Sequence, residues 1–329
     1  MACLFMQDKA MRPSLTATTA LPSTLRQVHA LPVTSSSLRN GLLAAGVTVL
    51  IWSVYFVSLQ LGMRSALTIP DMALFRYALP GLLLLPLLIR RWSTIVQIPL
   101  PYRIGIIAGG GLPFFMLSAK GMALSQVAVA STLIPGVAPL FISALAVLFF
   151  RQTLSRSRRI GLAIIAIGVL LLLGHAWLSA DADVLQGSLL LIAASSCWAV
   201  LTVSVRQSGL SPIEAASLVV VPNGGLALAL AWTAEVPFGF GGLPWWVLVS
   251  QGTVQGLLVG LGASLAYGHA ITRLGAELTS TIGALTPVVA AGLALLLLHE
   301  APTGVMLMGM ALVVCGVIAA SGWLTRPRR

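Results

Sequence analysis

Residues 131–140 read STLIPGVAPL and residues 279–287 read TSTIGALTP, two related apolar stretches that both contain proline. They belong to a longer match, because residues 118–172 align without a gap on residues 266–320 at a separation of 148 positions. The matched pairs include Ile134 with Ile282, Pro139 with Pro287, Gly161 with Gly309 and Gly168 with Gly316. Several matches in one register predict an internal duplication of the chain.

The start of each half matches as well, at slightly different separations. Trp52 meets Trp198 at 146 positions, and Pro70 meets Pro212 at 142 positions. The separations change by only a few residues, so short insertions distinguish the halves. We therefore expect two repeats, residues 41–177 and 187–323.

Both halves consist of apolar runs of about 20 residues, the length that a helix needs to cross the ~30 Å hydrocarbon layer of a membrane. An all-α integral membrane protein is expected, because lipid permits only helices and closed barrels as spanning structures. We predict ten spans, at residues 41–61, 70–89, 104–122, 128–149, 160–177, 187–205, 213–232, 246–268, 278–298 and 303–323.

The composition agrees with a chain that lies mostly in lipid. Of the 329 residues, 58% are hydrophobic and 8% are charged, and the mean hydropathy is +0.99. Soluble domains contain about 25% charged residues, so this composition excludes an ordinary soluble enzyme. The cysteines offer neither a disulfide framework nor metal-ligand spacing, since they stand far apart at Cys3, Cys197 and Cys315.

The net charge of +11 reflects topology rather than a nucleic-acid-binding surface. If the N-terminus is cytoplasmic, 16 of the 19 Lys and Arg residues lie on the cytoplasmic side, as the positive-inside rule requires. Arg64 and Lys120 then lie outside, and Arg76 lies within a span. Both termini are predicted to be cytoplasmic, in an inner or plasma membrane.

Each repeat contains five spans, an odd number, so the second copy must cross the membrane in the opposite orientation. The charges agree, because the connection at residues 150–159 carries four arginines whereas its counterpart at residues 299–307 carries no Lys or Arg. Ten transmembrane helices as two inverted five-helix repeats are typical of secondary transporters, whose substrate binds near the midplane between the halves. We expect two five-span bundles that rock against each other.

Residues 41–323 resemble the EamA-like transporters of the drug/metabolite transporter superfamily. Beside the two stretches quoted first, the resemblance rests on Arg76–Tyr77, His299–Glu300, Gly309 and Gly316. The sequence departs from the pattern at Gln152, where the first repeat would carry an acid, and at Leu218, the counterpart of Arg76. The resemblance implies an EamA-type fold and a carrier of small organic solutes, often an exporter of amino acids or related metabolites.

Arg76 is the most informative candidate residue. A charged side chain within a membrane helix is costly unless it meets water, an anion or a partner, so it is a functional candidate by default. Facing a cavity, its guanidinium would bind a substrate carboxylate or phosphate through two hydrogen bonds. The alternatives are that it extends to the outer interface or pairs with nearby Asp71.

Further polar and aromatic residues near the interruptions of the spans are expected to line the substrate site. Trp52 and Trp198 are equivalent by repeat and lie in mid-span, where they would either contact a planar or apolar part of the substrate or simply pack in the core. The expected substrate-binding set is Arg76, Trp52, Tyr55, Ser131, Thr132, Trp198, Asn223, Gln251, Gln255, Tyr267 and Ser280.

Proline and glycine are expected to interrupt several spans. Proline removes a backbone donor and frees a carbonyl, which in lipid must be satisfied by neighbours or by a water-lined cavity. Breaks at matching places in two halves indicate a transport site, although simple kinking for helix packing is the alternative. The helix-break or gating positions are Pro135, Pro139, Pro287, Gly110 and Gly224.

The acidic residues are placed as helix caps rather than as a proton relay. Asp71 and Glu214 open the second and seventh spans, where a carboxylate stabilises a helix N-terminus. None of the eight acids lies clearly in mid-membrane, which favours facilitated diffusion or exchange over proton antiport. Proton coupling through His269, Glu277 or His299–Glu300 stays open.

Other functions are weighed against the transporter. A membrane-embedded enzyme would need paired carboxylates, a metal cluster or an activated nucleophile, and the four histidines are scattered. A non-transporting sensor or scaffold would not need interrupted spans. We expect no catalytic, metal or cofactor site, a small-molecule substrate, lipid contact, and a monomer or weak homodimer. The stripe Gly252, Gly256 and Gly260 would pack within the chain or join two subunits.

The N-terminal and C-terminal segments differ in composition from the residues between them. Residues 1–40 are rich in Ser, Thr and Pro, which predicts a disordered cytoplasmic tail. A transit peptide, or translation from Met11, is the alternative. Residues 324–329 form a basic cytoplasmic C-terminus. The sequence does not give the identity of the substrate or the direction of transport.

Overall fold

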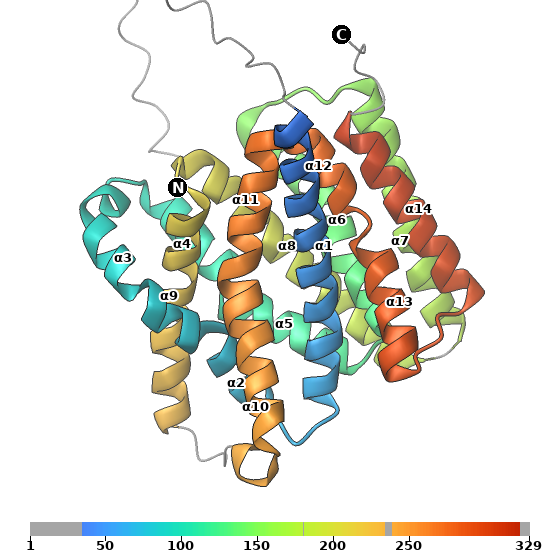
Figure 1. Ribbon diagram of the computed structural model, residues 1–329. Coiled ribbons are helices and arrows are strands. Elements are labelled where there is room, and N and C mark those ends of the chain that lie inside the picture. The colour runs from blue at the N-terminus through green and yellow to red at the C-terminus, as the bar shows by residue number, and fades with distance from the viewer. Residues whose placement is uncertain (1–34, 180, 234–238, 323–329) are drawn as a thin grey trace, which may run out of the picture. The chain divides into compact units, whose positions relative to one another are not determined.

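The computed structural model describes residues 35–179, 181–233 and 239–322, and its regular elements in these ranges are helices (Figure 1). Most of the expected N-terminal tail, and the expected basic end at 324–329, lie outside the described residues. The first repeat forms α1 (Ser35–Met63), α2 (Ile69–Ala73), the π-helix η2 (Leu74–Ala78), α3 (Leu79–Val96), α4 (Leu100–Gly109), α5 (Leu112–Ala123), α6 (Val127–Phe150) and α7 (Arg156–Leu178).

The second repeat contains a corresponding series of helices. It forms α8 (Ala182–Ser208), α9 (Pro212–Thr233), the 3₁₀-helix η3 (Gly239–Gly242), α10 (Trp245–Gln251), the π-helix η4 (Gly252–Gly262), α11 (Ala263–Leu274), α12 (Ala276–Gly283), α13 (Thr286–Leu298) and α14 (Gly304–Ser321). Within the described residues, ten helical stretches are long and apolar enough to cross a membrane. The prediction of ten spans is therefore confirmed.

Four of these spans are not uniform α-helices. The second consists of α2, η2 and α3, and the eighth consists of α10, η4 and α11, so each contains a π-helical segment. The third is divided between α4 and α5, and the ninth between α12 and α13. Such irregular backbone at membrane depth needs hydrogen-bond partners from neighbouring helices.

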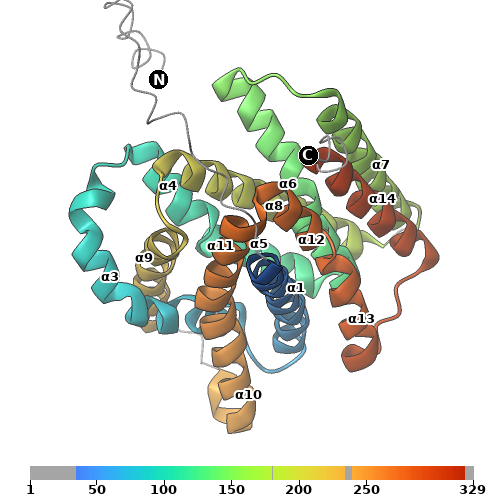
Figure 2. The same cartoon turned by 45° about the horizontal axis from the view of Figure 1, so that its top comes forward.

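Helices α7 and α14, the fifth spans of the two repeats, lie side by side (Figures 1 and 2). A Cβ on Gly161 would lie 2.6 Å from the carbonyl oxygen of Gly316, and one on Gly168 would lie 2.9 Å from that of Gly309. Small residues permit this close approach of two membrane helices. Because Gly161 matches Gly309 and Gly168 matches Gly316, the two contacts are equivalent under an inverted repeat.

The ends of the fourth and ninth spans also match. Arg151 and His299 terminate α6 and α13 in the left-handed conformation, with φ of 50° and 55°. The following helices, α7 and α14, are capped at their N-termini by Ser155 and Thr303, whose hydroxyls accept hydrogen bonds from the backbone N–H groups of Arg158 and Met306. The duplication seen in the sequence is therefore present in local geometry.

Helices of the two repeats pack against one another. Helix α8 packs against α4, α5 and α6, and α3 packs against α9. Helix α6 also contacts α13 and α14. The residues considered next lie on α1, η2, η4, α8 and α11, which come from both repeats.

Candidate functional site

One face of α1 carries three of the residues that build the site. Trp52, Tyr55 and Ser58 are spaced three apart, so they lie along one side of a helix. The Trp52 ring lies 6.4 Å from the ring of Trp198 on α8, in an edge-to-face arrangement, and 5.3 Å from the ring of Tyr267 on α11. The two repeat-equivalent tryptophans therefore meet, and all three rings are partly exposed.

Arg76 lies in η2, and only 9% of its surface is exposed. Its guanidinium carbon lies 5.0 Å from the centre of the Tyr55 ring, a cation–π geometry. Its Nη1 atom is buried and has no hydrogen-bond partner, and the Tyr55 hydroxyl is likewise buried without one. The guanidinium therefore does not extend to an exposed interface.

Asp71 does not neutralise Arg76. Its Oδ2 atom accepts hydrogen bonds from the backbone and hydroxyl of Thr68, both at 2.8 Å, and from the backbone of Gly239 at 3.1 Å. The other oxygen, Oδ1, is buried without a partner. Neither of the ion pairs Arg64–Glu300 and Arg91–Glu214 includes Arg76. A buried cation without a counter-ion is a feature that an anionic ligand would relieve.

The two π-helical segments pack directly against each other. A Cβ on Gly256 of η4 would lie 2.8 Å from the backbone oxygen of Phe75, and one on Gly260 would lie 3.0 Å from Pro80. The glycine stripe of the eighth span therefore packs within the chain, against η2 and α3. Because π-helical segments occur frequently at functional sites, their contact beside Arg76 marks this region.

A hydrogen-bond network joins α1 to the eighth span. The Ser58 hydroxyl donates to Oε1 of Gln251 at 2.8 Å, and Nε2 of Gln251 donates to the Ser58 carbonyl at 3.0 Å. Nε2 of Gln255 donates to the Ser58 hydroxyl at 3.4 Å. Both the oxygen and the nitrogen of the Gln251 side-chain amide are thus hydrogen-bonded, whereas Oε1 of Gln255 is buried without a partner.

Asn223, expected to bind substrate, is hydrogen-bonded on both sides of the break between α4 and α5. Its Oδ1 accepts from the backbone of Leu112 at 2.8 Å, and its Nδ2 donates to the carbonyls of Ile107 at 2.9 Å and Val219 at 2.8 Å. The Tyr77 hydroxyl donates to the carbonyls of Gly110 and Gly111, at 3.0 and 2.8 Å. These two side chains satisfy backbone groups that the interruption leaves free.

The remaining expected residues, Ser131, Thr132 and Ser280, lie on α6 and α12. Ser131 and Thr132 are fully buried, and their hydroxyls donate to carbonyls of their own helix at 2.7 and 2.6 Å. Ser280 lies in α12, partly exposed. The structure therefore brings together seven of the eleven, namely Arg76, Trp52, Tyr55, Trp198, Gln251, Gln255 and Tyr267.

Some of the expected helix breaks are present in the structure and others are not. Gly110 lies in the α4–α5 interruption, and Pro287 lies in the first turn of α13, directly after the break from α12. By contrast, α6 continues through Pro135 and Pro139 as one helix, so the expected interruption is absent there. Gly224 lies within continuous α9 and permits close packing, since a Cβ there would lie 2.7 Å from the Tyr77 carbonyl oxygen.

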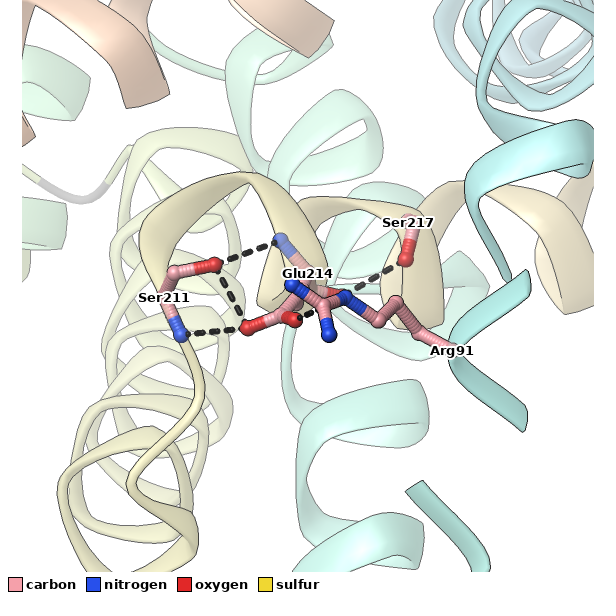
Figure 3. A network of polar contacts seen from close by, with 4 residues as sticks. All are labelled: Arg91, Ser211, Glu214 and Ser217. Carbon is pink, nitrogen blue, oxygen red and sulfur yellow. Dashed lines mark hydrogen bonds and ion pairs between the residues drawn. The ribbon is translucent and has the colours of Figure 1, made fainter. Parts of the chain in front are cut away.

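Asp71 and Glu214 form matching caps, as the sequence predicted. Thr68 and Asp71 make a capping box at α2, with each side chain bonded to the other's backbone. At α9, Glu214 Oε2 accepts from the hydroxyl and backbone of Ser211 at 2.6 and 3.0 Å, and Oε1 pairs with Arg91 at 3.0 Å (Figure 3). Ser217 also donates to the Glu214 carbonyl at 2.7 Å.

Sequence reasoning missed several contributors. Ser58 matched Ser204 in the repeat alignment, and Tyr77 belonged to the Arg76–Tyr77 pair, yet neither was assigned to the site. The spacing of Ser58 from Tyr55 was an available signal, because residues three apart share a helix face. Within the described residues, no group of three or more His, Cys, Asp or Glu side chains could hold a metal ion.

The fold and site define a multi-pass membrane protein built from two inverted five-helix repeats around a buried arginine. Comparison with known families agrees, because the EamA-like transporter family model matches residues 39–174 and again residues 185–322. The chain belongs to the EamA-like transporter family.

Two further comparisons are with curated proteins and with solved structures. No curated protein matches the sequence. A solved structure titled "Crystal structure of protein" is similar with a TM-score of 0.58 and 18% sequence identity, covering 88% of this chain and 100% of that one. This likeness supports the fold alone, and substrate and direction must be argued from the residues.

Proposed function

We propose that this transporter carries small organic solutes bearing an anionic group, such as amino acids or related metabolites, and that it exports them by alternating access. The observation that supports this most is Arg76, a buried guanidinium without a carboxylate partner among the described residues. A substrate carboxylate would supply the missing counter-charge and accept two parallel hydrogen bonds.

The aromatic residues suggest where the rest of the substrate lies. Trp52 is one helical turn from Tyr55, whose ring lies under Arg76, and Trp52 contacts Trp198 and Tyr267. An apolar or planar group of a solute bound at Arg76 would pack among these rings. Gln251 and Gln255 would complete the polar part of the site.

We place both termini in the cytoplasm and the protein in an inner or plasma membrane, on the distribution of Lys and Arg. Glu300 would then lie at the outer end. There it pairs with Arg64, and its Oε2 accepts from the backbone of Val127 at 2.9 Å. These contacts join α1, α6 and α13, so we assign this end as closed in the state described. Transport would require them to break.

Proton coupling and subunit association are left to measurement. A monomer or weak homodimer surrounded by lipid is our working proposal. The glycine stripe of η4 is used within the chain, so a dimer would have to form on another surface.

The experiment is efflux from proteoliposomes loaded with a mixed metabolite pool, with and without an imposed proton gradient, read by mass spectrometry. We expect carboxylated solutes to leave selectively and Arg76→Gln to stop them. The matched control is Arg90→Gln, which removes an exposed arginine from the same span and should leave efflux unchanged. A stimulating gradient would demonstrate proton coupling.

Two outcomes would contradict the proposal. Efflux that persists in Arg76→Gln would mean that the guanidinium does not bind substrate. No efflux of any solute would favour the other classes, a membrane-embedded enzyme or a non-transporting sensor or scaffold, which would be sought by assaying the same pool for chemical conversion.

A further inference from the structure

Three buried polar atoms without hydrogen-bond partners lie on α1 and on the two π-helical segments that pack beside it. They are Nη1 of Arg76, the hydroxyl of Tyr55 and Oε1 of Gln255. Arg76 and Tyr55 are in contact, and Gln255 bonds to Ser58, one turn along α1 from Tyr55. Gln255 lies on η4, which packs against η2, the segment that carries Arg76. Buried polar atoms are rarely left unpaired in a folded protein, so this set points to a ligand.

The hydrogen-bond network determines which atom of the Gln255 side-chain amide is left to bind that ligand. The Ser58 hydroxyl gives its single proton to Oε1 of Gln251 at 2.8 Å. It can therefore only accept from Gln255, which must turn its Nε2 toward Ser58 at 3.4 Å. The unpaired atom is consequently Oε1, an acceptor. The site thus presents a cationic donor at Arg76, a hydroxyl at Tyr55 and a neutral acceptor at Gln255.

The charges of the surrounding segments decide the net charge of the ligand. Helices α1, α3, α10 and α11 and the π-helical segments η2 and η4 contain no Asp or Glu. Helix α9 also packs against η2, and its Glu214 is bonded to Ser211 and Arg91. The nearest acid along the chain, Asp71, is held by Thr68 and Gly239 and forms no ion pair with Arg76. A ligand carboxylate would neutralise Arg76, but an ammonium on the same ligand would meet no Asp or Glu on α1, α10, α11, η2 or η4, and Asp71 is already held at its Oδ2 atom by Thr68 and Gly239.

We propose that the site selects a net monoanion with a hydrogen-bond donor beside its carboxylate, such as an α-hydroxy acid or an N-acyl amino acid, over a zwitterionic free amino acid. The inference rests on the proposed function and narrows its substrate class. The carboxylate meets Arg76 and Tyr55, and the neighbouring hydroxyl or amide N–H donates to Gln255.

Other anions fit this arrangement less well. Phosphate and sulfate present mainly acceptor oxygens, which would face the acceptor of Gln255. A carboxylate without an adjacent donor leaves that acceptor unpaired, which weakens binding about tenfold or more.

The test uses three probes that share a carboxylate and a phenyl ring and differ at one position. 3-Phenyllactate carries a hydroxyl there, phenylalanine an ammonium and 3-phenylpropionate a hydrogen. Their dissociation constants are measured by calorimetry on the full-length protein in lipid nanodiscs. We expect the dissociation constant of 3-phenyllactate to be lower than that of either other probe by about tenfold or more.

Two variants of Gln255 make the test specific. Gln255→Leu removes the acceptor, so 3-phenyllactate and 3-phenylpropionate should bind equally. Gln255→Glu adds the missing carboxylate, so phenylalanine should become the preferred probe. If Gln255→Leu fails to fold, the reversal in Gln255→Glu still decides the question.

Tightest binding of phenylalanine to the unaltered protein would overturn the inference. If Asp71→Asn then abolished that preference, Asp71 would be the partner of the ammonium. This failure is distinct from failure of the proposed function. In the latter case Arg76→Gln would leave the binding of all three probes and the efflux of carboxylated solutes unchanged.

Discussion

Arg64 and Glu300 lie 236 residues apart and form an ion pair that joins the end of α1 to the end of α13. The carboxylate of Glu300 is only 8% exposed and also accepts from the first backbone N–H of α6. One buried carboxylate thereby connects three spans. Its counterpart in the first repeat is Gln152, an uncharged residue. The ends of the fourth and ninth spans therefore differ in the charge of this side chain.

The first prediction concerns the strength of this pair. Arg64→Ala leaves the buried Glu300 carboxylate with the Val127 N–H alone, and we expect a loss of about 1–3 kcal/mol in unfolding free energy. Arg91→Ala is the matched control, because Glu214 keeps both hydrogen bonds from Ser211 and Arg91 is 58% exposed, so the loss should stay below about 1 kcal/mol.

Thermal unfolding of the purified variants in detergent provides the comparison. A melting temperature for Arg64→Ala at or above that of Arg91→Ala would show that the Arg64–Glu300 ion pair contributes no more than an exposed one.

The second prediction concerns movement at the same end. In a background without native cysteines, Arg64→Cys with Glu300→Cys should form a disulfide that keeps α1 and α13 together. Alternating access then predicts that oxidation stops efflux and that reduction restores it.

The control for this lock is Ser157→Cys with Ala319→Cys, across the closely packed α7 and α14, where the Ser157 hydroxyl lies 2.7 Å from the Ala319 carbonyl oxygen. We expect no separation of these helices, so this disulfide should leave efflux intact. Equal inhibition by both disulfides would mean that the motion is not centred on the Arg64–Glu300 end.

The third prediction compares two glycines of α7. A Cβ on Gly161 would lie 2.3 Å from the backbone nitrogen of Ala320, so Gly161→Ala must push α14 away and should cost about 1–3 kcal/mol. Gly174 has nothing within 4 Å, and Gly174→Ala should stabilise the helix by up to about 1 kcal/mol. The two melting temperatures should therefore move in opposite directions, and a shift in the same direction would contradict the packing of α7 on α14.

The fold follows closely from the sequence because lipid restricts the choice of structure. Span length, the odd number of spans per repeat and the matched glycines predict an inverted helical architecture. Pro287 also marks a real break, since α13 begins there. The continuity of α6 through Pro135 and Pro139 was not predictable, because a proline inside a helix is compatible with either a kink or an interruption.

The site was predictable only in part, for a related reason. Arg76 and the two tryptophans stand out because their residue types are unusual in mid-span. Ser131 and Thr132 have polar side chains too, but their hydroxyls donate to carbonyls one turn earlier in the same helix. Whether a polar side chain faces a ligand depends on partners distant in sequence, and periodicity does not show them.

The last prediction takes Asn223, whose partner on α5 is 111 residues away. Asn223→Leu leaves the Leu112 N–H and the Ile107 carbonyl unpaired, at about 1–3 kcal/mol for each buried group, so the variant should unfold at a clearly lower temperature. Thr202→Val is the control, since it removes an exposed hydroxyl bonded within its own helix and should change stability by less than about 0.5 kcal/mol. Because Tyr77 holds the same break, Tyr77→Phe and Asn223→Leu should be non-additive when combined. Additive losses would show that the two side chains support the α4–α5 interruption independently.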